Sequence, residues 1–196
     1  MVIQNSMGCG KLEAMALRFP IPIAEGAELR LVELRHARKM FALVEQNRER
    51  LGRHLPWVSH ILTVDDVRAF LRGVIAQHRK NLGFAAGIWL EDELVGVVGM
   101  HQIDWTNRNV ALGYWIARQW QGRGLVTSAS RALVRLCFTH FRLHRVEIQC
   151  GTKNRKSCAI ARRLGFRREG VLRGVQKLGE TYRDMVVYSK LESDRE

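Results

Sequence analysis

The stretch Asn109-Val-Ala-Leu-Gly-Tyr-Trp-Ile-Ala-Arg-Gln-Trp-Gln-Gly-Arg-Gly-Leu-Val-Thr127 decides the fold of this 196-residue chain. From Val110 to Ala117, apolar residues occupy both alternating sets of positions, which is typical of a strand buried on both faces. A short loop rich in glycine and polar side chains follows, and a helix is expected to begin near Leu125. The stretch therefore predicts a strand, a loop and a helix in direct succession.

The loop has the pattern Gln119-x-x-Gly122-x-Gly124. Its glycines allow the backbone amides to turn toward a common point without a Cβ in the way. Because the first amides of a helix lack internal partners and lie at the positive end of its dipole, a phosphate fits there. Arg123 adds positive charge and Thr127 adds a hydroxyl. Taken alone, the loop favours an ordinary tight strand-to-helix connection, and it matches neither the P-loop nor the dinucleotide-binding signature.

The strand ending Leu112-Gly-Tyr-Trp-Ile116, followed by this loop and a helix, resembles the acetyl-coenzyme A binding core of the GCN5-related N-acetyltransferase (GNAT) superfamily. The resemblance covers about residues 27 to 191 and implies a single α/β domain, in which helices flank a mixed, mostly antiparallel twisted sheet with a splayed central strand pair. Further motifs are similar to the RimJ/RimL-like branch, which acetylates ribosomal-protein N-termini: Asn154-x-x-Ser157, Leu164-Gly165-Phe166, Glu169-Gly170, Leu172-Arg173 and Tyr182-x-Asp184.

The resemblance implies that acetyl-coenzyme A binds along this core and leaves as coenzyme A. Its pyrophosphate is expected on the amides that open the helix, and its pantetheine arm beside the strand end that splays from the next strand. Asn154 matches the polar residue that contacts the cofactor arm in this branch. The expected cofactor-binding residues are Trp115, Ile116, Ala117, Gln119, Gly122, Arg123, Gly124, Leu125, Val126, Thr127, Asn154 and Ser157, and no metal ligand is expected.

The resemblance also implies direct acyl transfer without a covalent enzyme intermediate. A backbone N–H near Tyr114 is expected to stabilise the oxyanion that forms when the acceptor amine attacks the thioester. Ser157 matches the serine that gives the leaving sulfur a proton or a hydrogen bond. For Ser157 an alternative stays open, because Asn154-x-x-Ser157 is also a helix-capping pattern.

The base that takes the proton of the amine is not assigned by the resemblance. An N-terminal amine has a pKa near ~8 and lysine one near ~10.4, so an α-amine needs little help to lose its proton. The branch has a glutamate that could serve in the strand after Leu172-Arg173, but Gln176 stands there in this chain. The sequence does not rank the substitutes, which are His101, Asp104, Glu180 and Asp184.

The rest of the chain predicts the other elements of one domain. Residues 1–24 have no clear period and are expected to form a flexible leader before an N-acetyltransferase domain at 25–196. Alternating or spaced apolar residues predict the remaining strands and helices. The strands are expected at 27–34, 84–90, 94–103, 145–150, 171–177 and 185–191, and the helices at 37–51, from Thr63 to about His78, and after Asn154.

Composition excludes several classes of protein. No apolar run approaches the roughly 20 residues needed to span a bilayer, and charges interrupt the amino-terminal segment, so the chain is expected to be soluble and cytoplasmic. The cysteines fall at irregular positions and predict reduced, inert thiols rather than a zinc site or disulfides. They are Cys9, Cys137, Cys150 and Cys158. The formal net charge of +13 suits a polyanion such as coenzyme A, and it also keeps a protein soluble.

The leading interpretation is an acetyltransferase that acts on a primary amine, with the N-terminus of a ribosomal protein as the first candidate acceptor. A small amine such as an antibiotic, a polyamine or an amino-acid-like metabolite is the alternative. The second alternative is a basic binding module without catalysis; nucleic-acid binding is a minority reading of the charge. The branch often forms homodimers. Candidates for the wall of an acceptor pocket are Trp57, Trp105 and Tyr114.

Overall fold

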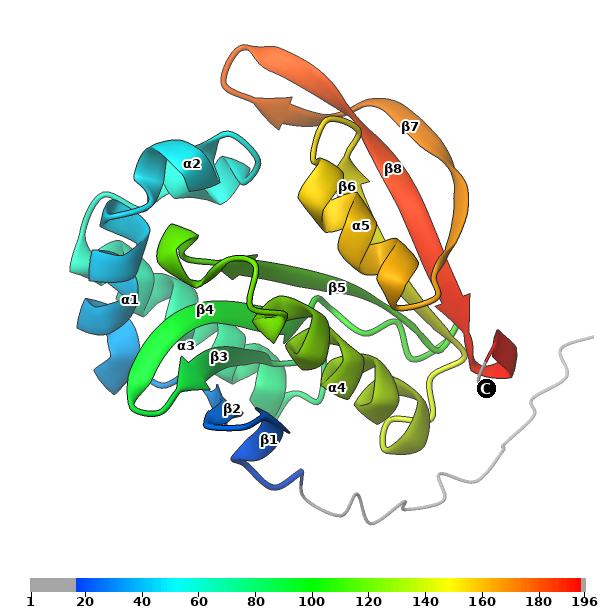
Figure 1. Cartoon of the computed structure of the whole chain (residues 1–196), viewed down its shortest axis with the longest axis horizontal. Coiled ribbons are helices and arrows are strands. Elements are labelled where there is room, and N and C mark those ends of the chain that lie inside the picture. The colour runs from blue at the N-terminus through cyan, green and yellow to red at the C-terminus, as the bar shows by residue number, and fades with distance from the viewer. Residues whose placement is uncertain (1–16, 195–196) are drawn as a thin grey trace, which may run out of the picture.

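An eight-stranded mixed sheet runs through the computed structural model, which describes residues 17–194 (Figure 1). Every neighbouring pair of strands is antiparallel except β5 and β6, which are parallel. This is the mixed, mostly antiparallel sheet that the sequence predicts. In spatial order the strands are β1 (Ile21–Ala24), β2 (Ala27–Leu31), β3 (Ala85–Leu90), β4 (Glu93–Met100), β5 (Asn109–Ile116), β6 (Arg145–Gly151), β8 (Thr181–Leu191) and β7 (Arg167–Leu178).

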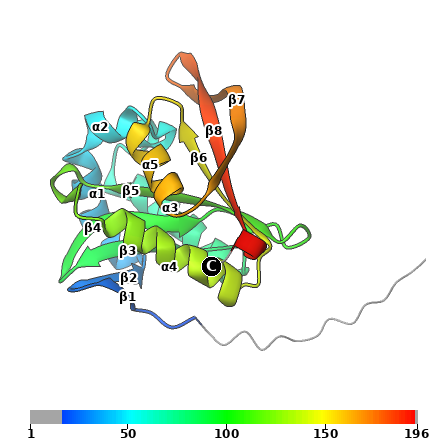
Figure 2. The same ribbon diagram turned by 45° about the vertical axis from the view of Figure 1, so that its right-hand side comes forward.

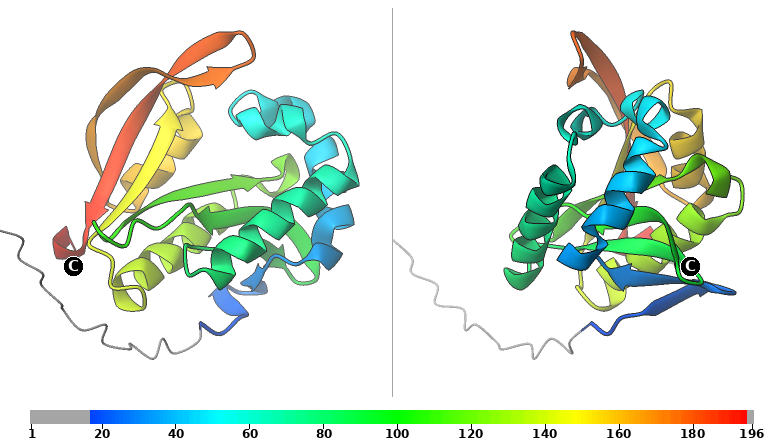
Figure 3. Two further views of the ribbon diagram at one scale, coloured as in Figure 1. Left: turned by 180° about the vertical axis from the view of Figure 1, so that it is seen from behind. Right: turned by 90° about the vertical axis from the view of Figure 1, so that its left-hand side faces the viewer.

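Helices cover both faces of the sheet. Helix α4 (Leu125–Thr139) lies along β1 to β5 on one face, with α5 (Arg155–Arg163) beside β6 (Figure 2). Helices α1 (Ala37–Glu45) and α3 (Val64–Arg79) lie on the other face, which is turned toward the viewer in the left panel of Figure 3. Each face therefore buries its own hydrophobic cluster. The short helices are α2 (Arg48–Gly52) and the 3-10 turns Leu34–His36, Pro56–His60, Arg118–Trp120 and Glu192–Asp194.

The start of α3 follows the predicted capping box. The Asp66 N–H donates to Thr63 Oγ1 at 3.2 Å, and the Thr63 N–H donates back to Asp66 Oδ2 at 2.7 Å. These two bonds satisfy amides that have no partner within the helix. The Thr63 hydroxyl and the N–H groups of Leu62 and Thr63 donate to the Asp66 carboxylate and lower its pKa below the ordinary value.

The expected helix at 37–51 is wrong in one respect, because it breaks into α1 and α2 at Asn47. The buried Asn47 side chain donates to the Leu43 carbonyl at 2.9 Å and accepts from the Arg118 N–H at 2.7 Å. The second bond joins the break to the chain just after β5. A contact with a residue far along the chain therefore places α2 beside the end of that strand.

Strands β5 and β6 splay apart, as predicted. Their ladder runs only from Asn109 paired with Arg145 to Leu112 paired with Ile148. Beyond it, β5 stays paired with β4 and β6 stays paired with β8. Beyond Leu112 and Ile148, the facing backbone groups of β5 and β6 are therefore not paired with each other.

Two other expectations need correction. Residues 114 and 115 are only partly buried, so β5 is not covered on both faces along its whole length; Tyr114 and Trp115 border open space instead of helix. In addition, Ile21–Ala24 of the expected leader pairs with β2 as β1. The part of that leader at 1–16 lies outside the described residues. The other predicted strands and helices are present with shifted ends.

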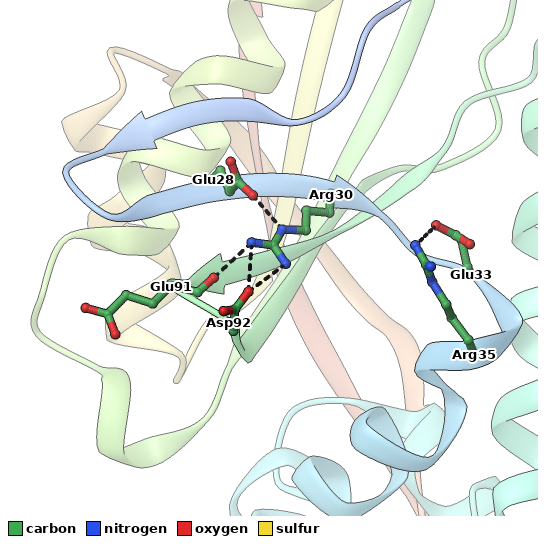
Figure 4. Close-up of polar contacts among 6 residues, drawn as sticks. All are labelled: Glu28, Arg30, Glu33, Arg35, Glu91 and Asp92. Carbon is green, nitrogen blue, oxygen red and sulfur yellow. Dashed lines mark hydrogen bonds and ion pairs between the residues drawn. The ribbon is translucent and has the colours of Figure 1, made fainter.

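An ionic network fixes the edge of the sheet at the β3–β4 turn (Figure 4). The Arg30 guanidinium on β2 donates to Glu28 at 2.5 Å, to the Glu91 carbonyl at 3.0 Å and to Asp92 at 3.4 Å. These exposed contacts tie the turn to the neighbouring strand and contribute little stability each. Within residues 17–194, no helix has both the length and the apolar character needed to cross a membrane.

Candidate active site

Two hollows meet where β5 leaves β6, with α2 and α5 on either side of the β5 end (Figure 1). The first, here called the outer groove, has a volume of about 350 Å³ and lies between α2, β5, α4 and the start of α5. The second, the inner cavity, has a volume of about 590 Å³ and lies between the sheet and the helices α1 and α3. The residues that line both are His54, Leu55, Tyr114, Trp115, Asn154 and Ser157.

Tyr114 and Ser157, the two predicted catalytic residues, touch at this junction. The Tyr114 hydroxyl lies 2.9 Å from Ser157 Oγ and 3.3 Å from the Ser157 carbonyl oxygen. Burial raises the pKa of Tyr114 above the ordinary value, so the phenol keeps its proton and can donate it in a hydrogen bond. The sequence predicted a catalytic role for the backbone near Tyr114 and a place for its side chain in an acceptor pocket, but not the contact with Ser157, which joins two elements far apart in the chain.

Asn154 fixes the position of Ser157 by capping helix α5. The Ser157 N–H donates to Asn154 Oδ1 at 3.2 Å, so Asn154 is the N-cap of α5. Since a capping bond fixes the first turn of a helix, it also fixes the position from which the Ser157 hydroxyl reaches Tyr114. The capping role and a role at the junction are therefore compatible.

The glycine loop has the conformation that its pattern predicts. Gly122 has φ 82° and Gly124 has φ 78°, in the left-handed region, and Gly124 is the N-cap of α4. No atom among residues 17–194 lies within 4 Å of a Cβ built on either glycine, apart from the chain neighbours. The amides that open α4 thus lie beside free space, a suitable place for a phosphate. The Arg123 guanidinium stacks on Trp120 at 4.5 Å from the ring centre.

The outer groove is lined by cations. Arg50, Lys153, Arg155 and Lys156 border it, and the residues that line it include no carboxylate. Arg50 donates to the Ile116 carbonyl on β5, while its buried Nε has no hydrogen-bond partner among the described residues. These cations and the free Nε fit a polyanion with polar groups along its length, and acetyl-coenzyme A has that chemistry.

The expected cofactor residues divide into three groups. Five of them line the outer groove: Trp115, Ile116, Val126, Asn154 and Ser157. The exposed loop residues do not line it, so contact between their backbone and the cofactor stays a prediction; they are Gln119, Gly122, Arg123 and Gly124. The remaining three are buried, and Thr127 Oγ1 accepts a bond from Arg163 at 3.0 Å; they are Ala117, Leu125 and Thr127.

Sequence reasoning missed the cations of the outer groove. Lys153, Arg155 and Lys156 flank the Asn154-x-x-Ser157 motif, so a basic run at a helix N-terminus was a usable signal. Arg50 carried no such signal, because its place in the groove depends on the break at Asn47.

The inner cavity, in contrast to the positively charged outer groove, has an uncharged lining. None of the described residues that line it is an aspartate, glutamate, lysine or arginine. Its titratable side chains are His54, His101, Tyr114 and Cys150. Burial lowers the pKa of both histidines and raises that of Cys150, and nearby arginines lower the pKa of His54 further. All four side chains are therefore neutral near pH 7.

The four substitute bases now differ in position. His101 lines the inner cavity, as does Gln176, the residue at the position of the branch's glutamate. Asp104 accepts hydrogen bonds from Asn107, and Asp184 accepts one from the Gly174 N–H at 2.8 Å; neither lines the cavity. Glu180 is exposed at the turn between β7 and β8 and does not line it either.

The aromatic residues predicted for the wall of the acceptor pocket also differ in position. Trp57 and Trp115 line the inner cavity with ring centres 6.0 Å apart, and Tyr114 lies beside them. Trp105 is not part of that wall, because its indole N–H donates to the Asn81 carbonyl at 2.7 Å. Within residues 17–194, no group of three or more His, Cys, Asp or Glu side chains could hold a metal ion. The described cysteines are free and buried; Cys9 lies outside the described residues.

Several known proteins with the same architecture are acetyltransferases. The model of the Acetyltransferase (GNAT) domain family matches residues 27–167. The ribosomal-protein-serine acetyltransferase of Escherichia coli (strain K12) is 29% identical over 171 residues, covering 87% of this chain and 96% of the relative.

Solved structures agree with this family match. The RimL ribosomal L7/L12 alpha-N-protein acetyltransferase in complex with coenzyme A superposes with a TM-score of 0.85 at 26% identity, covering 88% of this chain and 98% of that one. The microcin C7 self-immunity acetyltransferase MccE, in complex with acetyl-CoA and AMP, has a TM-score of 0.82 at 27% identity, with 86% and 94% covered.

Proposed function

Because the chain belongs to the GNAT acetyltransferase family, it is an acyltransferase that uses acetyl-coenzyme A, and we propose that its acceptor is the α-amine at the N-terminus of a ribosomal protein. The ribosomal acceptor is that of the E. coli relative and of the RimL neighbour. The cytoplasm, where such an acceptor is made, is the proposed location.

One observation carries the choice of an α-amine. The inner cavity, which adjoins Tyr114 and Ser157, has no acidic side chain among the described residues that line it. A carboxylate would hold an acceptor as its ammonium ion, whereas an uncharged wall favours the neutral amine that can attack. An α-amine, with a pKa near ~8, reaches that state far more readily than lysine or a polyamine, with pKa values near ~10.4.

The outer groove and the inner cavity then have separate roles. Acetyl-coenzyme A supplies the acetyl thioester. The cations of the outer groove and the amides at the start of α4 hold its phosphates, and the splayed end of β5 pairs with its arm. The backbone near Tyr114 stabilises negative charge on the carbonyl oxygen as the amine attacks. Ser157, fixed by Asn154 and Tyr114, donates a hydrogen bond to the leaving sulfur.

A small-molecule amine is the second candidate, and the likeness to MccE favours it. A small acceptor would have to fit within the inner cavity, of about 590 Å³. A protein N-terminus needs to enter that cavity only with its first residues. The two candidates therefore differ in whether a long chain attached to the amine is tolerated. A homodimer stays a prediction, to be checked by sedimentation.

The test is coenzyme A release measured with a panel of acceptors, after acetyl-coenzyme A binding has been established by calorimetry. The panel contains ribosomal protein L7/L12, a peptide of its N-terminal sequence, the same peptide with a blocked N-terminus, and spermidine. We expect release with the free N-terminus and none with the blocked one. Release with spermidine alone would establish the small-amine alternative, and binding without release from any acceptor would support a non-catalytic module.

A further inference from the structure

The floor of the inner cavity contains two glycines that face one another across the β4–β5 ladder, Gly99 and Gly113. The imidazole of His101 occupies the space above Gly113. A Cβ added at Gly113 would collide with the His101 ring, with Nε2 as its nearest atom. The bare backbone at this position is therefore what allows the histidine to lie on the strand.

The backbone of His101 fixes its ring there. Strand β4 ends at Met100, and the next N–H, that of His101, donates to the Ala111 carbonyl on β5 at 2.8 Å. This bond continues the ladder by one residue. The ring therefore lies over the residue that precedes Tyr114, on the side of the inner cavity.

Among the described residues, those that line the cavity around His101 carry no competing charge. The cavity wall formed by α1, α3, the neighbouring strands and the β7–β8 hairpin includes no acidic or cationic side chain among its described residues. Its other titratable groups are the buried Tyr114 and Cys150, which keep their protons, and His54, which lies near Arg50, Arg53 and Arg183. Desolvation by the surrounding protein lowers the pKa of His101, although the residue is exposed on one side, so its ring is neutral and can accept a proton near pH 7.

We propose that His101 is the general base of the transfer, accepting the proton that the acceptor amine loses at the junction with Tyr114. The proposal rests on the proposed function. Gln176, the alternative at the branch's own position, is an amide and cannot take up a proton near neutral pH. Imidazole is suited to the task, because a base works best when its pKa is close to the working pH.

The step balances within the site. The amine nitrogen bonds to the acetyl carbon as the carbon–sulfur bond breaks, and the electron pair of that bond goes to sulfur. Before this bond forms, the ammonium form of the acceptor gives one proton to the His101 ring. The second proton, which the nitrogen loses on becoming an amide, goes to water. The sulfur takes a proton from the Ser157 hydroxyl, which Tyr114 and water replenish, and His101 returns its proton to water. The products are an amide and a thiol.

The test compares the pH dependence of His101→Gln with that of the wild type, using the L7/L12 N-terminal peptide and saturating acetyl-coenzyme A. His60→Gln is the matched control, because His60 is an exposed histidine like His101 but lines neither hollow. We expect kcat of His101→Gln to fall about 10- to 100-fold at pH 7, where about a tenth of an α-amine is already neutral. The loss should shrink above about pH 8, because the acceptor is then mostly neutral in solution and His101 no longer has an ammonium proton to remove.

Gly113→Ala provides a second variant that leaves the histidine in place but displaces its ring. It should show the same loss at pH 7 and the same recovery at high pH. Unchanged acetyl-coenzyme A affinity in both variants would show that the fold is intact. An equal rate in His101→Gln, or a loss that is the same at every pH, would overturn the role of His101. A wild type that acetylates no member of the acceptor panel would refute the proposed function instead.

Discussion

Replacing Tyr114 with phenylalanine removes a single oxygen atom from the junction of the outer groove and the inner cavity. That oxygen lies 2.9 Å from Ser157 Oγ, in a partly buried contact. A buried neutral hydrogen bond of this kind contributes about 1 to 2 kcal/mol when its partner is left unsatisfied. If the bond orients the Ser157 hydroxyl toward the leaving sulfur, Tyr114→Phe should lower kcat by roughly 5- to 30-fold.

A double-mutant cycle separates this orienting role from packing. Ser157→Ala alone should lower kcat by about 10- to 100-fold, because the sulfur loses its donor, while the Kd of acetyl-coenzyme A changes little. In the Ser157→Ala background, Tyr114→Phe should then have almost no further effect on kcat. The coupling energy should therefore equal most of the cost of the single Tyr114 change, about 1 to 2 kcal/mol.

The assay is steady-state coenzyme A release for the wild type, both single variants and the double variant, with calorimetric Kd values for acetyl-coenzyme A. Phenylalanine keeps the ring that packs against the core, so the fold should be retained. Additive effects on kcat would refute the reasoning, because they would mean that Tyr114 acts independently of Ser157. A loss confined to Kd would refute it as well, since the contact would then serve binding only.

Three further predictions follow from the fold and the site. Gly124→Val should raise the Kd of acetyl-coenzyme A about tenfold or more, because Gly124 has φ 78°, whereas Gly170→Val, at an ordinary φ with open space around it, should not. Leu133→Ala should lower the free energy of unfolding in urea by about 2 to 5 kcal/mol, because Leu133 is fully buried under the sheet. The Arg145 guanidinium and the Ser189 hydroxyl lower the pKa of Glu169 to about 2, so its stabilisation is complete above the ordinary value of 4.5 and is lost as the pH falls through about 2. Glu169→Gln should therefore destabilise by about 1 kcal/mol at pH 7, since the pair is partly exposed, with a difference from the wild type that narrows below pH 4.5 in thermal unfolding.

The parts of the fold that the sequence predicted are those with local causes. The Thr63 and Asn154 caps, the left-handed glycines at 122 and 124, and the strand–loop–helix order around them are all set by residues close together in the chain. Such signals need no knowledge of tertiary contacts. The splay of β5 from β6 was predicted as well, but only through resemblance to a family, since no residue pattern marks where a ladder ends.

The parts that could not be predicted depend on contacts between distant residues. The break between α1 and α2 follows from Asn47 capping the Arg118 amide, 71 positions away. The Tyr114 to Ser157 contact spans 43 positions, and the missing side chain at Gly113 means little until the His101 ring is placed over it. Each residue has an ordinary local explanation, so only the assembled sheet shows that they share one site.

The distribution of charge between the two hollows explains why a basic protein can carry out this reaction. The formal net charge of +13 would disfavour binding of an ammonium acceptor if positively charged side chains also surrounded the reacting atoms. Instead, the cations that line the site border the outer groove, where we propose that the polyanionic cofactor binds and neutralises them. The inner cavity is lined by neutral side chains, and the junction of the two hollows is bridged by the neutral Tyr114 and Ser157 pair. In the proposed mechanism, positive charge therefore serves cofactor binding, while the acceptor amine meets a wall that favours its uncharged, nucleophilic form.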